Sequence, residues 1–159
     1  MRVVLQRVSR AAVRVHGAET GRIGAGYVAL VGIARGDGDA DLAYIVRKLV
    51  GLRLWPAAGD DGGAHAAMQA PLGSRAVLVI SQFTLLADTR HGMRPSWDAA
   101  APADLARPLY ESLLVRLRGA GVVVASGIFG ADMEVELVNQ GPVTVVLDSR
   151  GQSDTVRGS

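Results

Sequence analysis

The sequence predicts a single α/β domain with a mixed sheet, in which strands predominate and two helices lie between them. Its 159 residues fit one domain that is large enough to bury a core. Two uninterrupted apolar runs, Tyr27–Ile33 and Ala76–Ile80, are typical of strands buried on both faces. Two other segments, residues 41–52 and the stretch after Pro102, repeat apolar residues at spacings of three and four, as amphipathic helices do.

The first third of the chain is expected to form strands and then a helix. Residues 2–16 alternate between apolar and polar side chains, which predicts one long strand that can accommodate a bulge. Residues 17–26 are rich in turn formers and place Ile23 in a short return strand, ahead of the strand 27–33. Asp37–Asp39 supplies turn and capping residues for the helix 41–52. The apolar positions of this helix are Leu42, Ile45, Val46, Leu49 and Leu52.

The middle of the chain contains one strand and the second helix. Residues 56–63 are expected to form a loop, whereas residues 64–74 fit no element. The strand 76–80 ends in the polar segment Ser81–Leu85, and residues 88–101 are expected to form an ordered loop. The second helix follows Pro102 and ends at two glycines, 119 and 121. Its apolar stripe is predicted to be Leu105, Leu109, Leu113 and Leu117.

Three short strands are expected near the end of the chain. They cover residues 122–124, 134–138 and 143–147, and the last two are joined through Asn139–Pro142. Residues 1–149 then form the domain, and the small polar residues 150–159 are expected to be a disordered tail.

Composition limits the functional classes. Nearly half of the residues are apolar, 49%, and 20% are charged, which is the profile of a globular protein. No apolar run is long enough for a membrane span, and charges near the start argue against a secretory signal, so we expect a cytoplasmic protein with no membrane partner. The chain has no cysteine, which excludes thiolate ligands and cysteine nucleophiles. A net charge of only +2 is weak evidence for a polyanionic partner.

The sequence offers few groups for familiar catalysis. Its three histidines, His16, His65 and His91, are scattered, and none has the helical spacing or the neighbouring carboxylates of a zinc motif. We therefore expect neither a metal nor a cofactor. A Gly-x-Ser-x-Gly elbow and a phosphate-binding loop are also missing from the sequence.

Two segments stand out, and each has a structural alternative. Ser81–Thr84 places polar groups directly after a buried strand, where open sheets present residues to ligands, but the same hydroxyls can simply cap the strand end. Asn139–Pro142 contains Gly141, which permits unusual dihedral angles, and a Gly-Pro bond that can be cis. The alternative for the second segment is an ordinary hairpin with proline at a turn position and a trans bond, which is by far the commoner state.

Taken together, these segments resemble the D-aminoacyl-tRNA deacylase family over nearly the whole chain. Four stretches carry the resemblance in the same order: Leu5–Ala11, then Ser81–Leu85 with 87–96 behind it, then Gly127–Met133, and finally Asn139–Thr144. The resemblance implies a β/β/α layered domain, and a homodimer whose active sites lie at the subunit interface. It implies editing of the aminoacylated tRNA 3′ end, with no DNA partner.

The resemblance also implies roles for particular residues. The Gly141–Pro142 bond is cis in that family and reaches into the neighbouring subunit, where the two carbonyls hold the substrate amino group and exclude L side chains. Glycyl-tRNA, without a side chain, would also be accepted. Arg7 would orient this element, whereas the residues expected to line the pocket are Phe129, Ala131 and Met133. Arg90 and Arg94 are the candidate tRNA contacts.

The catalytic candidates are the residues of the segment Ser81, Gln82, Phe83 and Thr84. An aminoacyl ester is already activated, so positioning and oxyanion stabilisation can be sufficient for hydrolysis. Backbone N–H groups near Phe83 and Thr84 would stabilise the oxyanion, and Ser81 and Gln82 would orient the terminal adenosine and the ester. Thr84 lacks a base, so we expect water to attack with help from the ribose 2′-hydroxyl.

The loop after this segment departs from the family pattern. Leu86 occupies a position where an aromatic residue is common, His91 one where a basic residue is usual, Met93 one where asparagine is frequent, and Trp97 one where phenylalanine is typical. Three other functions are compatible with parts of the sequence. They are a non-catalytic RNA-binding module, a small-molecule esterase and a scaffold without activity, although the sequence lacks both a triad and interleaved basic and aromatic residues.

Overall fold

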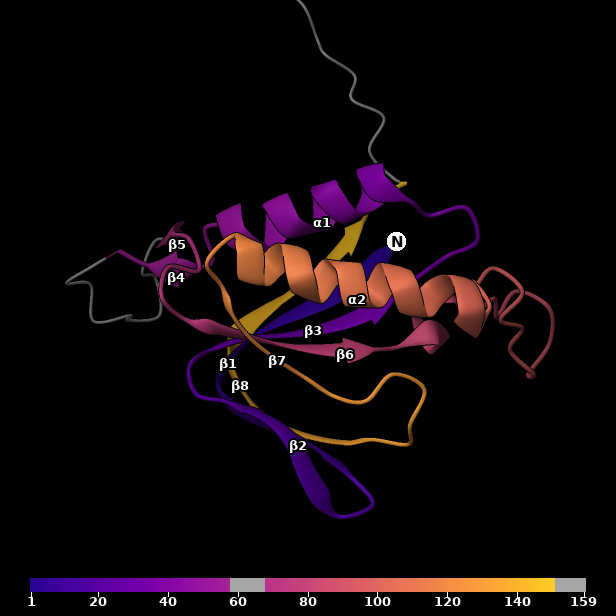
Figure 1. Cartoon of the computed structure of the whole chain (residues 1–159), viewed down its shortest axis with the longest axis horizontal. Coiled ribbons are helices and arrows are strands. Elements are labelled where there is room, and N and C mark those ends of the chain that lie inside the picture. The colour runs from indigo at the N-terminus through magenta and orange to yellow at the C-terminus, as the bar shows by residue number, and fades with distance from the viewer. Residues whose placement is uncertain (58–67, 151–159) are drawn as a thin grey trace, which may run out of the picture.

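A computed structural model describes residues 1–57 and 68–150 of the chain (Figure 1). The two long helices are α1 (Asp39–Gly51) and α2 (Ala103–Gly119), and a short 3₁₀ helix is η1 (Phe83–Leu86). The strands are β1 (Arg2–Val15), β2 (Ala18–Ile23), β3 (Gly26–Gly32), β4 (Trp55–Pro56), β5 (Met68–Ala70), β6 (Ala76–Ser81), β7 (Val123–Ser126) and β8 (Glu134–Asp148).

The long strand β1 organises the sheet. Its first half pairs antiparallel with β3 and its second half with β2, while β8 pairs antiparallel along nearly its whole length. Beyond β3, strands β6 and β7 continue the sheet in parallel pairings. The order β2-β1-β3-β6-β7, with β8 on β1, confirms the predicted mixed sheet in a single strand-rich domain.

The central strands are buried on both faces because each face packs against a different layer. Figure 1 shows α1 and α2 side by side on one face of the sheet. Tyr27 and Val79 point into the core beneath these helices, whereas Val28, Leu78 and Ile80 belong to a second core. This second core is closed by residues of β1, β2 and β8. The result is the β/β/α layering implied by the family resemblance.

Gly26 allows β3 and β6 to approach closely at the start of their parallel pairing. A Cβ atom at this position would lie 1.9 Å from the carbonyl oxygen of Ala76. Since that oxygen belongs to the backbone of the neighbouring strand, it cannot move aside like a flexible side chain. The register that carries β6 to Ser81 therefore depends on glycine at this position.

The expectation of two separate strands at 134–138 and 143–147 was wrong, because both belong to β8. The 14-residue strand β1 is long enough to pair with both, one after the other. The register runs from Val8 opposite Asn139 to Gln6 opposite Thr144, so residues 140–143 bulge out of the ladder. Pro142 has no N–H to contribute to a ladder. The Gly141–Pro142 peptide bond is cis, as the family resemblance implies.

The buried stripe of the second helix matches the prediction in part. Leu113 and Leu117 are buried and Leu109 packs half-buried against the core, whereas Leu105 is 58% exposed. The complete set of buried residues is Ala106, Tyr110, Leu113, Leu114 and Leu117. Steps of four residues overshoot a helical turn, so positions 105 and 117 differ by about 120° around the axis. The first helix begins slightly earlier than predicted, at Asp39, and the Asp41 carboxylate accepts a hydrogen bond from the Gly38 N–H at 2.9 Å.

Several expectations fall partly or wholly outside the described residues. These are the tail from residue 151 onward and most of the loop 56–63. Of the unassigned stretch 64–74, the described part contains β5, which pairs with β4. In residues 1–57 and 68–150, neither long helix has the length and apolar character required to cross a membrane.

Candidate active site

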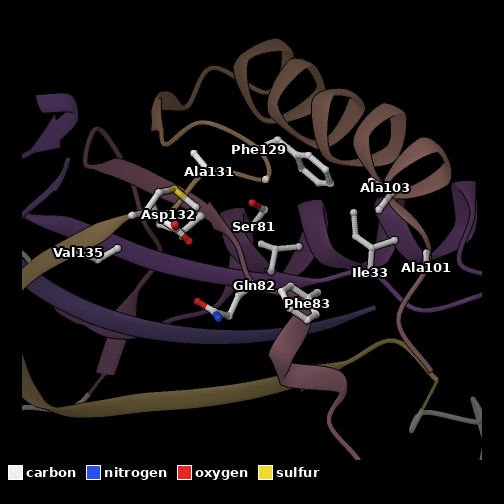
Figure 2. Close-up of a pocket in the computed structure, with 15 residues that line it drawn as sticks. Ile33, Ser81, Gln82, Phe83, Ala101, Ala103, Phe129, Ala131, Asp132 and Val135 are labelled. Atoms are coloured by element: carbon white, nitrogen blue, oxygen red, sulfur yellow. The ribbon is translucent and has the colours of Figure 1, made fainter. Parts of the chain in front are cut away.

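A cavity of about 420 Å³ opens at the carboxyl end of β6 (Figure 2). The start of α2 lies above it, and the connection between β7 and β8 forms another wall. Much of its lining is apolar, and Val31, Ile80 and Ala106 in it are all at least nine-tenths buried. The complete lining is Val31, Ile33, Ile80, Ser81, Gln82, Phe83, Ala101, Ala103, Ala106, Phe129, Gly130, Ala131, Asp132, Met133 and Val135. Its size suits a small ligand or the end of a larger one.

The segment after β6 is fixed by the neighbouring strand β3. Ser81 is the last residue of β6 and pairs with Val31, and the Gln82 N–H donates to the Val31 carbonyl at 2.7 Å. Gly32 lies beneath the turn, where a Cβ atom would come within 3.0 Å of the Gln82 carbonyl oxygen. The backbone thus leaves the sheet at a defined place and enters η1 beside the cavity.

Two backbone donors at the start of η1 have no backbone acceptor among the described residues. Leu85 N–H donates to the Gln82 carbonyl at 3.2 Å, but Phe83 and Thr84 donate to no carbonyl there. This is expected for the first residues of a 3₁₀ helix, whose N–H groups have no partner inside the helix. Such paired donors next to a cavity can stabilise negative charge on an oxygen atom.

The Thr84 hydroxyl has a single side-chain partner within residues 1–57 and 68–150. The Gln82 Nε2 donates to Thr84 Oγ1 at 2.5 Å. A threonine nucleophile needs a basic group to take up its proton, and an amide nitrogen cannot serve as one. The geometry therefore favours a positioning role for both side chains.

The opposite wall is formed by residues 127–133. A Cβ atom on Gly127 would lie 2.3 Å from Met133 Sδ, so glycine makes room for the methionine that lines the cavity. The Phe129 ring packs against the Tyr110 ring at 5.6 Å between centroids and beneath the Arg107 guanidinium at 4.8 Å. Ala131 also lines the cavity (Figure 2).

Tyr110 joins this wall to the core. Its hydroxyl donates to the Val79 carbonyl at 2.8 Å, and the residue is 2% exposed. Burial raises the pKa of Tyr110 to about 12, because the charged phenolate would be poorly solvated there. The hydroxyl therefore stays protonated and hydrogen-bonded at neutral pH.

Asp132 is a cavity residue that the sequence did not single out. It has the one ionisable side chain among the described residues that line the cavity. A carboxylate here can attract the cationic α-amino group of an aminoacyl ester. The available signal was its position between Ala131 and Met133, which the family resemblance had already assigned to the pocket.

The bulge of β8 lies outside the cavity of its own chain. Residues 139–142 are all exposed, and neither Gly141 nor Pro142 belongs to the cavity lining. Arg7 contacts the bulge, since its Nε donates to the Gln140 carbonyl at 3.0 Å and its Nη1 to the Leu54 carbonyl. The structure thus brings Arg7 to the Gly-Pro segment but brings neither of them to Ser81–Thr84 of the same chain.

The two candidate tRNA contacts differ in whether their positive charge is already paired with a carboxylate. Arg90 Nη2 lies 2.6 Å from Asp88 Oδ2, and hydrogen bonds from Arg90 lower the pKa of Asp88 to about 2. Arg94 is exposed and takes part in no ion pair with another described residue. Both lie on the loop beyond η1, outside the cavity lining. Arg94 therefore has the more available charge.

A search of residues 1–57 and 68–150 for clustered metal ligands finds no group of three or more His, Cys, Asp or Glu residues. The polar side-chain groups on the lining are the Ser81 hydroxyl, the Gln82 amide and the Asp132 carboxylate. These groups can orient a polar substrate.

Comparison with known proteins decides the family. A family model described as D-Tyr-tRNA(Tyr) deacylase matches residues 4–148, which is nearly the whole chain. The chain belongs to the D-aminoacyl-tRNA deacylase family. Membership makes it a hydrolase of the tRNA-editing type.

Individual relatives of the deacylase family match over their full length. A D-aminoacyl-tRNA deacylase from Anaeromyxobacter dehalogenans is 51% identical over 150 residues, covering 94% of this chain and 98% of the relative. Another from Beutenbergia cavernae is also 51% identical, covering 94% of this chain and 100% of the relative.

Two solved structures resemble the deacylase fold described above. One, named "c-Myc DNA Unwinding Element Binding Protein", superposes with a TM-score of 0.82 at 36% identity, covering 93% of this chain and 98% of the other. The second is described as a probable eukaryotic D-amino acid tRNA deacylase and has a TM-score of 0.75 at 17% identity, covering 92% and 97%. The second likeness is one of fold alone.

Proposed function

We propose that the chain hydrolyses the ester bond between a D-amino acid and the 3′ end of tRNA in the cavity beside β6, releasing the free D-amino acid and tRNA. The observation that carries this proposal is the pair of free N–H groups, Phe83 and Thr84, at the edge of the cavity. An aminoacyl ester is reactive enough that fixed donors and correct positioning can supply the catalysis. The substrate would be met in the cytoplasm.

Water is the nucleophile in this mechanism. It adds to the ester carbonyl, and the resulting oxyanion accepts hydrogen bonds from the Phe83 and Thr84 N–H groups. The ribose 2′-hydroxyl relays the proton lost by water to the departing 3′ oxygen, so that a carboxylic acid and a free ribose hydroxyl are formed. Ser81 and Gln82 orient the terminal adenosine and the ester. No step requires a metal or a cofactor.

Chirality is set by the Gly-cisPro element of a second copy of the chain. In a homodimer, the carbonyls of Gly141 and Pro142 of the partner subunit enter the cavity and hold the substrate α-amino group. An L side chain collides with them, so selectivity comes from repulsion and not from affinity for one side chain. The exposure of residues 139–142, and their position outside their own cavity, supports this arrangement.

The same repulsion predicts which other substrates are accepted. Phe129, Ala131 and Met133 present uncharged side chains to the cavity, so many D side chains are tolerated, and glycyl-tRNA escapes exclusion because glycine has no side chain. Arg7 keeps the partner-directed bulge in place through the Gln140 carbonyl. Arg94, and more weakly Arg90, contact tRNA phosphates, so binding weakens as salt is added.

The proposal is tested with D-tyrosyl-tRNA, L-tyrosyl-tRNA and glycyl-tRNA, each incubated with the protein with and without a chelator. We expect rapid loss of the D ester, slower loss of the glycyl ester, an unchanged L ester and no effect of the chelator. Equal cleavage of D and L esters would contradict the stereochemical mechanism, and an effect of the chelator would contradict the metal-free one.

A second candidate function is a nucleic-acid-binding module without catalysis. It is favoured by one observation, the likeness to the 36% identical structure, whose protein is named for binding a DNA unwinding element. Filter binding with uncharged tRNA and with single- and double-stranded DNA separates the two candidates. Retention of nucleic acid by a protein that leaves every D ester intact would support the module.

A further inference from the structure

An aromatic pair lies exposed at the rim of the cavity. Phe83 is 58% exposed and Trp97 is 42% exposed, and their rings meet edge to face with centroids 5.9 Å apart. The chain has only two phenylalanines and two tryptophans. The other phenylalanine, Phe129, packs against Tyr110. The other tryptophan, Trp55, is buried, with 4% of its surface exposed. The exposure of the pair at the rim is therefore unusual in this molecule.

The loop that carries Trp97 is firmly attached to the domain. Asp88 and Ser96 exchange two backbone hydrogen bonds, with Asp88 N–H donating at 2.8 Å and Ser96 N–H at 3.0 Å. Beyond Trp97, the Arg35 Nε donates to the Asp98 carbonyl at 2.8 Å. The backbone on both sides of Trp97 is thus held in place, which lowers the entropic cost of stacking a ligand on its exposed ring.

Phe83 connects the pair to the reaction centre. Its ring contributes to the cavity lining, where Figure 2 shows it close to Gln82, and its N–H is one of the two free donors. An RNA chain whose 3′-terminal ester lies in the cavity would leave the protein past this rim. The first group outside the cavity is then the nucleotide that precedes the esterified one.

We infer that Phe83 and Trp97 form a stacking platform for the base of the penultimate tRNA nucleotide, with Arg94 beside it to contact the phosphate. This subsite rests on the proposed function and extends it along the RNA. Aromatic faces stack on every base, so the platform fits an invariant single-stranded end without reading its sequence. Arg94 is three residues from Trp97 and, unlike Arg90, forms no ion pair with another described residue.

The first test compares a full and a truncated substrate. Trp97→Ala is expected to lower kcat/KM for D-tyrosyl-tRNA by about 5- to 150-fold, the range of one lost stacking contact. Hydrolysis of D-tyrosyl-adenosine, which lacks the penultimate nucleotide, should change less than about twofold because its reacting centre is intact. Trp97→Phe should retain most of the activity on tRNA. The control is Val115→Ala, which truncates another exposed apolar side chain, on α2.

Two kinetic results would overturn the inference. Equal losses on D-tyrosyl-tRNA and D-tyrosyl-adenosine would show that the ring acts on the reacting nucleotide or on the fold. An unchanged kcat/KM on tRNA would show that the exposed ring contacts no RNA.

A second test needs no hydrolysis, so its failure is distinguishable from failure of the proposed function. Trp97 is the only exposed tryptophan of the two, and a Trp55→Phe variant leaves it as the sole indole fluorophore. A single-stranded CCA trinucleotide should quench its fluorescence, whereas adenosine alone should not. If the Trp55→Phe variant fails to fold, acrylamide quenching of the wild-type protein gives the same readout. Acrylamide reaches the exposed Trp97 but not the buried Trp55, so CCA should reduce the quenching.

The fluorescence test also distinguishes an alternative occupant. An indole that is shielded from acrylamide in the free protein, and becomes accessible on dilution, would identify a contact between copies of the chain. That result, like quenching by adenosine alone, would contradict the penultimate-base platform.

Discussion

The two halves of the proposed site are built in opposite ways. The half at the end of β6 rests on the buried core and is bonded to its surroundings: the Gln82 N–H donates to the Val31 carbonyl, and Ile80 beneath it is fully buried. The half on β8, residues 140–143, leaves the ladder and is largely exposed, with Arg7 as its contact. Buried neighbours support the first half within its own chain, whereas the second is exposed and lies outside the cavity of its own chain.

This contrast predicts that the strand packing beneath the first half cannot be altered without a large loss of stability. Gly26→Ala should destabilise the protein by about 3 kcal/mol or more, because the new methyl group would collide with the backbone of Ala76. Gly24→Ala is the matched control: no atom lies within 4 Å of its Cβ position, and its cost should stay within about 0.5 kcal/mol. Denaturant midpoints measure both, and equal values would contradict the packing argument.

Substitutions that affect the exposed half should mainly lower the selectivity for D over L esters, with a smaller effect on the free energy of unfolding. Arg7→Ala removes the side chain that holds the Gln140 carbonyl, and the ratio of D- to L-tyrosyl-tRNA hydrolysis should fall about tenfold, the effect of one lost charged hydrogen bond. Arg14→Ala is the control, since Arg14 also links β1 to β8, through Glu136 at 3.3 Å. A selectivity ratio that falls equally in both variants would remove the special role of Arg7.

Alkaline pH should lower the free energy of unfolding through the buried tyrosines of the core. Burial raises the pKa of both Tyr27 and Tyr110 to about 12, from an ordinary value of 10. Between these values the unfolded chain loses protons that the folded chain keeps, so stability is complete below about pH 10 and falls as the pH rises toward about 12. Urea unfolding at pH 8, 10 and 11 measures the decline, and Tyr110→Phe should make it shallower. A stability that rises over this range would contradict the assignment.

The smallest effect is expected at Thr84. Thr84→Ala removes the acceptor of the Gln82 amide but leaves both backbone donors, so activity on D-tyrosyl-tRNA should fall less than about tenfold. Loss of a true nucleophile typically costs about 10⁴-fold or more. Single-turnover rates with intact tRNA binding separate the two, and the larger loss would show that Thr84 attacks the ester.

The half at the end of β6 was largely predictable because its pattern is local. Tyr27–Ile33 and Ala76–Ile80 are apolar at every position, and the structure uses both faces by turning alternate residues into two separate cores. The polar segment after Ile80 then follows from the end of the strand. Gly32 and Gly127 could not have been assigned, since their importance depends on atoms far away in the sequence.

The exposed half was harder to predict for the same reason. Residues 139–142 have the composition of a turn, and only the length of β1 makes them a bulge within one strand. Leu105 was misassigned because a regular four-residue spacing drifts around a helix. Asp132 and Trp97 are single residues in irregular segments, where no periodicity indicates which way a side chain points.

Mixed dimers test most directly whether Gly141 and Pro142 serve the neighbouring subunit. One protomer carries Ala131→Trp, which fills its cavity, and the other carries Gly141→Ala and Pro142→Ala, and the two are purified together by separate tags. The mixed dimer should recover D-selective hydrolysis at roughly half the wild-type rate, because one of its two symmetric sites is complete. A mixed dimer no more active or selective than its two parents would contradict the account.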